Sequence, residues 1–355
     1  MLDNPLLIRA DASKEIGTGH VMRCLALAQS WKKRGGDAAM VHAVRNRSIK
    51  QRLNSEGVGS RSIDAKRGSD KDAQHTLQQA RRIGADWIVL DGYVFDEGYQ
   101  QQIAESERGL LVVDDEANHN RYSGDFLLNQ NLHANEEDYS SRVSAATKLL
   151  TGPQYALLRK EFWTWKDWER DIPDVAKSLL VMIGGSDPDN ITSEVLSSLA
   201  ELDVPNMEIY AVIGGSNSHE ASIREVAESL RFDVHLFEDV QNIPELMARA
   251  DLAVSAGGST IWELAFMQVP TLGIARAEQE IHLLEAADER GIAKNLGGSQ
   301  DLSTSELRGG IEKMALDTEY RVSMMEQGRN TVDGNGAHRV AQLMYQTDKT
   351  NGLGQ

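Results

Sequence analysis

The sequence predicts an α/β protein with two doubly wound domains, each built on a parallel sheet that carries helices on both faces. The chain has 355 residues, which is more than one hydrophobic core usually organises. Short apolar runs alternate with helix-like stretches, as in parallel sheets whose strands are buried on both faces. This alternation breaks after about residue 150 and restarts near residue 178, which indicates a second sheet.

The first half contains five short apolar segments that are typical of buried strands. They are LLIR (6–9), DAAMVHAV (37–44), WIVLD (87–91), GLLVVDD (109–115) and DFLLNQN (125–131). Helix-like runs at 21–33 and 72–83 end at glycines, which commonly terminate helices. We therefore expect residues 1–150 to form an N-terminal Rossmann-like domain.

The second half repeats the pattern. Its strand-like segments are SLLVMIGG (178–185), MEIYAVIGG (207–215), FDVHLF (232–237), DLAVSAGG (251–258) and VPTLGIA (269–275), with helix-like runs at 191–202, 220–230, 243–250 and 260–266. We expect a C-terminal Rossmann-like domain over 178–345, whose last helix packs back on the N-terminal domain, and a frayed tail over 346–355. In such a pair of domains a ligand binds in the cleft that the carboxyl ends of the strands face.

The segment 151–177 differs from both halves. It contains Pro153, Pro173 and three of the six tryptophans, together with many charged residues. Two interpretations stay open, an interdomain connection or an amphipathic surface helix.

Charge and cysteine content exclude several classes of protein. The formal net charge of −17 disfavours nucleic-acid binding, which needs a basic surface. A single cysteine, Cys24, rules out an intrachain disulfide framework and favours a reducing compartment. The start MLDNPLLIRADAS lacks a basic region followed by a long apolar one, and no run of about 18 apolar residues occurs. We expect a cytoplasmic protein without membrane insertion.

The charge is concentrated in the second half. Residues 1–150 carry 20 Lys and Arg against 21 Asp and Glu, whereas residues 151–355 carry 17 against 33. If this acidic half binds a phosphorylated ligand, backbone amides and helix N-termini must supply most of the contacts.

The first glycine-containing turn places a histidine between a strand and a helix. Gly17 and Gly19 allow the backbone to approach a ligand closely, and His20 stands at the helix start. Met22 occupies the third glycine position of a dinucleotide motif, which disfavours NAD. A lone histidine is commonly structural, but at such a turn, facing the expected cleft, His20 is a candidate general base.

Two glycine turns in the second half suggest a diphosphate site. Their residues are Gly184, Gly185, Ser186 and Asp187 in one, and Gly257, Gly258, Ser259 and Thr260 in the other. Each follows a predicted strand and precedes a helix, so their N–H groups would face one edge of the sheet. The alternative is that both are tight turns with helix caps.

Other polar residues at strand ends complete the candidate site. Asp11, Asp91 and Tyr93 end strands of the first half and would line its wall. Glu263, on the first turn of a helix, would accept ribose hydroxyls or merely satisfy the helix dipole. Asp114 and Asp115 have no third ligand nearby, so we expect neither a metal nor another cofactor.

Taken together, several segments resemble one family over residues 7–343. They are RADASKEIGTGHVMRCLALA, VLDGY, VVDDE, LLNQN, LLTGPQYALLRKEF, IGGSDPDN, SAGGSTIWELAFMQVPTLGI and DGNGAHRVAQLM. The family is that of the UDP-2,4-diacetamido-2,4,6-trideoxy-β-L-altropyranose hydrolases of pseudaminic acid biosynthesis. The SAGGST segment is shared with GT-B glycosyltransferases generally. The resemblance implies a GT-B-like fold and a role in flagellin glycosylation or surface polysaccharide synthesis.

The resemblance also implies roles for single residues. His20 would activate water for attack on the anomeric carbon, with cleavage of the C1–O bond, inversion and no metal, and Tyr93 would belong to the same site. UDP would be held mainly by the C-terminal domain, with Glu263 on the ribose and Gln279 near the diphosphate. The uracil would lie against backbone between Val240 and Ile243. The sequence departs from some relatives at 278–280, which read Glu-Gln-Glu instead of containing Asn-Gln.

Two other functions remain open. A glycosyltransferase of the same fold, acting in surface polysaccharide synthesis, would show a basic and apolar patch on its first domain if it used a lipid acceptor. That half is nearly neutral, although RNRSIKQRL (45–53) is basic. A non-catalytic nucleotide-sugar-binding protein would not need a base such as His20.

Overall fold

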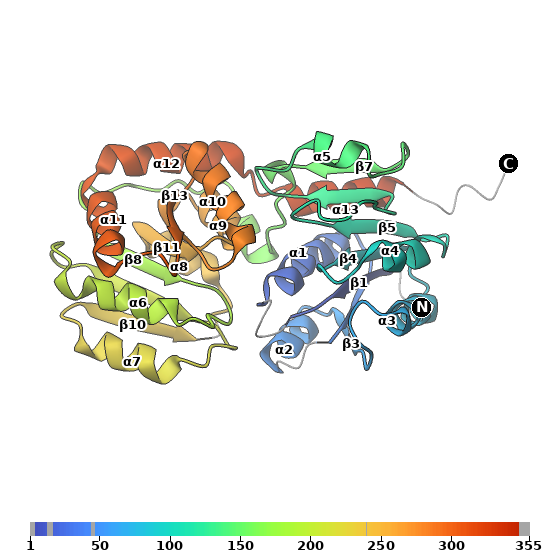
Figure 1. Cartoon of the computed structure of the whole chain (residues 1–355), viewed down its shortest axis with the longest axis horizontal. Helices are drawn as coiled ribbons and strands as arrows, with labels where there is room; N and C mark the ends of the chain where they lie inside the picture. The colour runs from blue at the N-terminus through green and yellow to red at the C-terminus, as the bar shows by residue number, and fades with distance from the viewer. Residues whose placement is uncertain (1–3, 13–16, 44–46, 239, 348–355) are drawn as a thin grey trace. The chain divides into compact units, whose positions relative to one another are not determined.

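The computed structural model describes residues 4–12, 17–43, 47–238 and 240–347, and the chain forms two compact units (Figure 1). Most residues up to Lys160 cluster with the chain from Gly334 onward, and Glu161–Asp333 form the second unit. The division falls inside the segment 151–177. That segment contains two 3₁₀ helices, Pro153–Tyr155 and Lys160–Trp165, but no α-helix, so its interpretation as an amphipathic surface helix is wrong.

The first unit is built on a seven-stranded parallel sheet with the order β3-β2-β1-β4-β5-β6-β7. The strands are β1 Leu6–Ala10, β2 Ala38–His42, β3 Gly59–Ser62, β4 Trp87–Asp91, β5 Gly109–Val113, β6 Phe126–Asn129 and β7 Lys148–Thr151. The helices are α1 Gly19–Lys33, α2 Arg47–Ser55, α3 Asp70–Ile83, α4 Glu97–Ala104, α5 Glu136–Ser140 and α13 Gly336–Gln346.

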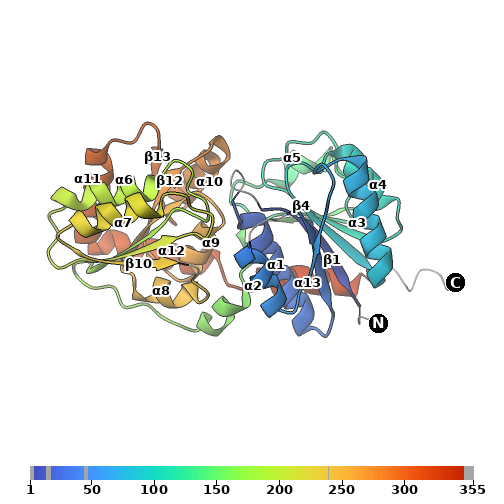
Figure 2. The same cartoon turned by 90° about the horizontal axis from the view of Figure 1, so that it is seen from below.

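Side chains of β1 alternate between two cores because successive residues of a strand point to opposite faces. Leu6 and Ile8 pack with residues of α1 and α13, whereas Leu7 packs with residues of α3 and α4. Figure 2 shows these two pairs of helices on opposite faces of the sheet. The predicted doubly wound arrangement is therefore present in this unit.

The last helix, α13, belongs to the first unit, although the second unit precedes it in the chain. Ser30 on α1 hydrogen-bonds His338 at 2.6 Å. Gly336 is required for close approach, since a Cβ there would lie 2.2 Å from the carbonyl oxygen of Ala156. Most of the tail 346–355, which we expected to fray, lies outside the described residues.

The second unit is built on a six-stranded parallel sheet with the order β10-β9-β8-β11-β12-β13. The strands are β8 Ser178–Met182, β9 Glu208–Ile213, β10 Asp233–Glu238, β11 Leu252–Ala256, β12 Thr271–Ala275 and β13 Lys294–Gly298. The helices are α6 Ile191–Ser198, α7 Glu220–Ser229, α8 Ile243–Arg249, α9 Thr260–Phe266, α10 Glu278–Glu289, α11 Thr304–Leu316 and α12 Thr318–Thr331. Across the described part of the chain, no helix has the length and apolarity that crossing a bilayer requires.

Each sheet has one point at which the strand order reverses. In the first sheet it lies between β1 and β4, and in the second between β8 and β11. Helices that follow these strands leave on opposite faces, so a crevice opens at the carboxyl ends, where open α/β sheets bind ligands. We therefore expect a functional site at the carboxyl ends of the strands at these two points.

Two buried arginines link the segment 151–177 to the second unit through hydrogen bonds. Arg170 donates to the carbonyl oxygens of Met247, at 2.6 Å, Met267 and Ala250. Its guanidinium also lies 4.9 Å from the ring centroid of Trp168. Arg321 on α12 donates to the carbonyl of Pro173 at 2.5 Å. The irregular segment is thus held by side chain to backbone hydrogen bonds rather than by secondary structure.

We expect Arg170→Ala to destabilise the second unit by about 3 kcal/mol, because three buried carbonyl oxygens lose their donor and a cavity remains. Urea unfolding followed by the fluorescence of Trp168 would measure the loss. Arg329→Ala removes an exposed ion pair with Glu169 and should cost less than about 1 kcal/mol. Equal losses in the two variants would contradict this account.

Candidate active site

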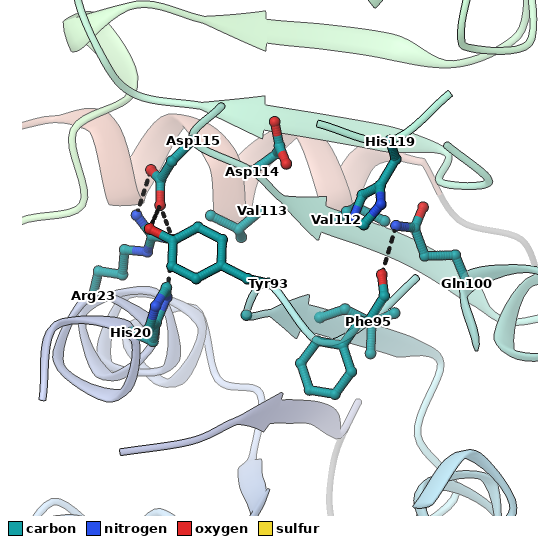
Figure 3. Close-up of a pocket in the computed structure, with 12 residues that line it drawn as sticks. His20, Arg23, Tyr93, Phe95, Gln100, Val112, Val113, Asp114, Asp115 and His119 are labelled. Carbon is teal, nitrogen blue, oxygen red and sulfur yellow. Dashed lines mark hydrogen bonds and ion pairs between the residues drawn. The ribbon is translucent and has the colours of Figure 1, made fainter. Parts of the chain in front are cut away.

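His20 lies at the start of α1, beside the carboxyl end of β4 (Figure 3). Gly17, with φ of +69°, turns the backbone just before the helix, and Gly19 is the first helical residue. The imidazole is 7% exposed, and its Nδ1 lies 2.7 Å from Oδ1 of Asp91, the last residue of β4. The fold therefore joins the turn after β1 to the neighbouring strand end.

The partner of Nδ1 determines the tautomer of His20. Nδ1 lies 2.7 Å from Asp91, which only accepts, and 3.2 Å from Nη2 of Arg23, which only donates. Because the contact with the carboxylate is the shorter one, we assign the proton to Nδ1, which donates to Asp91. The neutral ring then has its lone pair on Nε2, and no hydrogen bond among the described residues uses that nitrogen. This arrangement presents Nε2 as a proton acceptor.

Arg23, one turn after His20 on α1, holds two carboxylates at once. Its Nε and Nη2 donate to the two oxygens of Asp91, each at 2.7 Å. Its Nη1 and Nη2 donate to Asp115 at 2.8 and 2.9 Å. Paired contacts of this kind fix orientation as well as charge.

These charges keep Asp91 ionised although it is fully buried. Burial by itself raises the pKa of Asp91, but Arg23 and His20 outweigh it and hold that pKa well below its ordinary value. The pKa of Asp115 is lowered as well, because Arg23 outweighs the effect of burial. Burial, with the Asp91 charge, raises the pKa of the Cys24 thiol well above its ordinary value, so Cys24 is a neutral donor to Asp91.

Tyr93 forms the exposed side of this cluster. The residue is 50% exposed, and its ring meets the His20 ring edge-on, with centroids 5.1 Å apart. Its hydroxyl donates to Asp115 at 3.3 Å, and Asn131 donates to the same carboxylate at 3.0 Å. Figure 3 shows the hydroxyl end of Tyr93 directed at Asp115 above His20. Solvent therefore reaches the cluster beside the imidazole and the phenol.

Asp11, which we expected at the same wall, has other partners. Its carboxylate accepts from the amide of Ala43 at 2.6 Å and pairs with Arg9 at 2.7 Å. Arg9 also binds Asp72 of α3 through two contacts of 2.9 and 2.8 Å. The structure thus brings His20, Asp91 and Tyr93 together and places Asp11 in a separate ion cluster.

No metal-binding group is evident in the residues that the structure describes. Asp114 accepts from the amide of Ala117 and the hydroxyl of Tyr139, each at 2.7 Å. Asp115 is paired with Arg23. Within the described ranges, no three His, Cys, Asp or Glu side chains converge as a metal site would require.

In the second unit, the turn after β8 caps the helix that follows it, as the alternative interpretation of this turn allowed. Asp187, with φ of +39°, is fully buried and caps α6, accepting from the amides of Ile191 at 2.8 Å and Thr192 at 3.0 Å. Ser186 is buried beside it, while Gly184 is exposed with φ of +102°. The amides of Ile191 and Thr192 therefore already have an anion, and the diphosphate cradle that we expected at this turn stays a prediction.

The turn after β11 packs against a charged pair. A Cβ on Gly257 would lie 2.8 Å from Cβ of Glu280, whose carboxylate binds Arg276. Gly258 follows, and Ser259 precedes α9 without a side-chain cap. Glycine at position 257 is therefore needed for the approach of α10.

The remaining predicted contacts lie around the same unit. Thr260 opens α9, and Glu263 lies on the first turn of that seven-residue helix, partly exposed. Gln279 is exposed at the start of α10. Ile243 is buried where α8 begins, and Val240 before it is partly exposed. Their contacts with a nucleotide stay a prediction.

Sequence reasoning missed the residues that orient the site. Arg23 lies three residues after His20, on the same face of α1, and this spacing was the available signal. Asp115 was considered only as a metal ligand, Asn131 was not singled out, and Arg276 was passed over although it ends a predicted strand.

Residues 179–342 match the glycosyltransferase family 28 C-terminal domain. An uncharacterized protein of Methanocaldococcus jannaschii is 26% identical over 280 residues, 77% of this chain and 56% of that protein, so the chain spans little more than half its length. The spore coat polysaccharide biosynthesis protein SpsG of Bacillus subtilis is 23% identical over 340 residues, 95% of this chain and 96% of that protein. The UDP-2,4-diacetamido-2,4,6-trideoxy-β-L-altropyranose hydrolase of Campylobacter jejuni is 21% identical over 263 residues, 74% and 88% respectively.

Solved structures extend the likeness over nearly the whole chain. MurG of Acinetobacter baumannii has a TM-score of 0.66 at 13% identity, covering 97% of this chain and 100% of its own. The fold is of the GT-B type. The UDP-GlcNAc 2-epimerase of Neisseria meningitidis, bound to UDP-GlcNAc, has a TM-score of 0.68 at 12% identity, covering 97% of this chain and 100% of its own. The predicted GT-B-like fold is confirmed, and at these identities the likeness establishes the fold alone.

We expect Arg23→Met to destabilise the first unit by about 3–5 kcal/mol near neutral pH, because Asp91 and Asp115 lose their shared cation while buried. In the wild type the pKa values of Asp91 and Asp115 are lowered by their pairing with Arg23. The stabilisation that this pairing gives is therefore complete above about pH 4 and is lost as the pH falls below that value. In Arg23→Met the pKa values of both carboxyl groups rise. Protonation of these two groups should therefore reduce the loss of stability as the pH decreases from about 8 to about 5.

Denaturant unfolding at the two pH values would measure this difference. Arg34→Met, at the exposed end of α1, is the matched control and should leave stability nearly unchanged at both. A loss that does not depend on pH would contradict the ion network.

Proposed function

We propose that this protein hydrolyses a UDP-linked diacetamido sugar, UDP-2,4-diacetamido-2,4,6-trideoxy-β-L-altropyranose or a close relative, to UDP and the free sugar. The Campylobacter jejuni relative carries that activity in its name, and the neighbouring epimerase structure holds a UDP-sugar. The observation that carries the proposal is the His20–Asp91 pair. Its geometry is that of a general base, which a protein that only bound nucleotide sugars would not need.

The pair suits proton abstraction from water. Asp91 fixes the His20 tautomer and orientation and stabilises the imidazolium that forms when Nε2 takes a proton. Arg23 holds Asp91 in place from the other side, so the base is oriented before substrate arrives. General-base catalysis of this type contributes about 10²–10⁴-fold to a rate.

In the proposed reaction the water oxygen attacks C1 of the sugar while His20 accepts one proton. The bond between C1 and the phosphate oxygen breaks, and its electron pair leaves with UDP. Attack opposite the departing oxygen inverts C1. Tyr93, whose pKa is raised well above its ordinary value by burial of its hydroxyl and by Asp115, remains a neutral phenol and contributes a sugar-facing ring.

A GT-B glycosyltransferase remains the second candidate. Its support is the family 28 domain match and the similarity to a spore coat polysaccharide biosynthesis protein. The two candidates differ in the acceptor. A hydrolase releases free sugar from UDP-sugar alone, whereas a transferase needs an added hydroxyl acceptor for comparable turnover.

We expect His20→Asn to lower kcat about a hundredfold or more while leaving the affinity for UDP unchanged, because the base is lost and the nucleotide contacts are not. Proton NMR would follow sugar release and calorimetry would follow UDP binding. His235→Asn, at a partly exposed position of β10, is the control and should behave as the wild type. Undiminished turnover in His20→Asn, or sugar release only after an acceptor is added, would refute the hydrolase.

We also propose that the reaction needs no metal, and EDTA tests this. Chelation followed by dialysis should leave the rate unchanged, and added Mg²⁺ or Mn²⁺ should not raise it, because His20 rather than a metal ion activates the attacking water. A loss of activity that a divalent cation restores would contradict the metal-free mechanism.

A further inference from the structure

Arg276 lies at the edge of the second sheet where both glycine turns meet. It directly follows β12, and the order β8-β11-β12 puts three neighbouring strand ends side by side. A Cβ on Gly184, after β8, would lie 3.1 Å from Nη1 of Arg276. Because Gly257, after β11, packs against Glu280 in the same way, the two turns enclose the Arg276–Glu280 pair.

Glu280 occupies only one side of the Arg276 guanidinium. Nε donates to the two carboxylate oxygens at 3.1 and 3.2 Å, Nη2 donates to Oε1, and the backbone N–H of Arg276 donates to Oε2 at 2.8 Å. Among the described residues, no hydrogen bond uses Nη1, the nitrogen nearest Gly184. The side chains are 23% and 13% exposed, so the pair is sheltered yet open to a ligand.

The charge around Arg276 is otherwise negative. Asp187 and Asp189 lie close enough to act on it electrostatically, and Glu278 begins the same helix as Glu280. A diphosphate that approached this edge would be repelled unless a cation met it. Two of the amides that begin α6, those of Ile191 and Thr192, already donate to Asp187, so these two donors do not replace a cation.

We propose that Arg276 binds the diphosphate of the nucleotide and that Glu280 is an internal counter-ion which the phosphate displaces. The inference rests on the proposed function for the identity of the ligand as a nucleoside diphosphate. A planar guanidinium pairs with phosphate as it does with carboxylate, so phosphate oxygens replace those of Glu280 at Nε and Nη2 or bind at Nη1. Glu280 keeps the guanidinium oriented in the empty protein, and its return favours release of UDP.

Calorimetry on the full chain, with UDP and with inorganic pyrophosphate as ligands, tests this exchange. Arg276→Ala should raise the Kd of both ligands at least tenfold. Glu280→Gln should lower both Kd values severalfold, because a neutral amide competes less well for the guanidinium. The matched control is the Arg224–Glu220 pair on α7, which has the same spacing but is about half exposed. Arg224→Ala and Glu220→Gln should leave both Kd values unchanged.

The opposite response to the two substitutions separates binding from mere support of the fold. If Arg276→Ala binds UDP as tightly as the wild type, the proposal is wrong. If Glu280→Gln weakens binding as Arg276→Ala does, the pair is a scaffold and the proposal is again wrong. Thermal unfolding of each variant checks that it is folded. The double variant Arg276→Ala/Glu280→Gln should also be folded and should bind both ligands weakly.

The same experiment distinguishes this inference from the proposed hydrolysis. If the wild type binds UDP with the expected dependence on Arg276 and Glu280 but releases no sugar, only the hydrolase is refuted. If the wild type binds neither UDP nor pyrophosphate, the diphosphate site is refuted.

Discussion

The site of the first unit depends on one buried carboxylate, that of Asp91. A buried charge costs several kcal/mol unless it is paired and hydrogen-bonded, and Asp91 accepts from His20, Arg23 and Cys24. Arg23 is itself nearly buried and needs more than one carboxylate, which Asp115 supplies. Each ion therefore fixes the next, and the imidazole at the end of this series is held in one orientation in the absence of any ligand.

The fold delivers these ions to one place through strand order. β1 and β4 are neighbours in the sheet although about 80 residues separate them in the chain, so the turn after β1 and the end of β4 meet. The second unit uses the same position, between β8 and β11, in another way. There the strand ends carry glycines, and the space that these leave is filled by Arg276 and Glu280. One edge is thus built from an ion network of side chains, and the other from glycine turns that pack around a single ion pair.

The sequence predicted the central strands and the edge strand β10, but it missed the edge strands β3 and β13, for a physical reason. Central strands such as β4, which reads WIVLD, are buried on both faces and are therefore continuously apolar. β3 reads GSRS and β13 reads KNLGG, and each pairs with only one neighbour at the edge of its sheet, so neither shows the apolar signal.

The candidate site shows the same division between local and long-range information. The position of His20 follows from the turn that contains it, a local feature. Asp91 was expected at the same wall because it ends a strand, but its pairing with His20, 71 residues away, could not be read from any spacing. The same holds for the pairing of Arg23 with Asp115, 92 residues away. Asp187 was expected near a ligand but caps a helix, the role that the alternative interpretation of its turn had kept open.

Because the second half of the chain is acidic, the Arg276–Glu280 pair can select among the anions that reach it. An exposed arginine would attract any anion, whereas one already held by a carboxylate exchanges partners only with an anion that offers more charge and several oxygens in a matching plane. The surrounding carboxylates add a repulsion that a singly charged anion does not overcome with one contact. In the proposed exchange a diphosphate meets both conditions, and once the sugar has left, the same repulsion and the return of Glu280 would favour the departure of UDP. Tight retention of UDP would slow each cycle of the proposed reaction. The negative charge of this half of the chain, which makes it an unpromising phosphate site, would therefore speed the release of UDP.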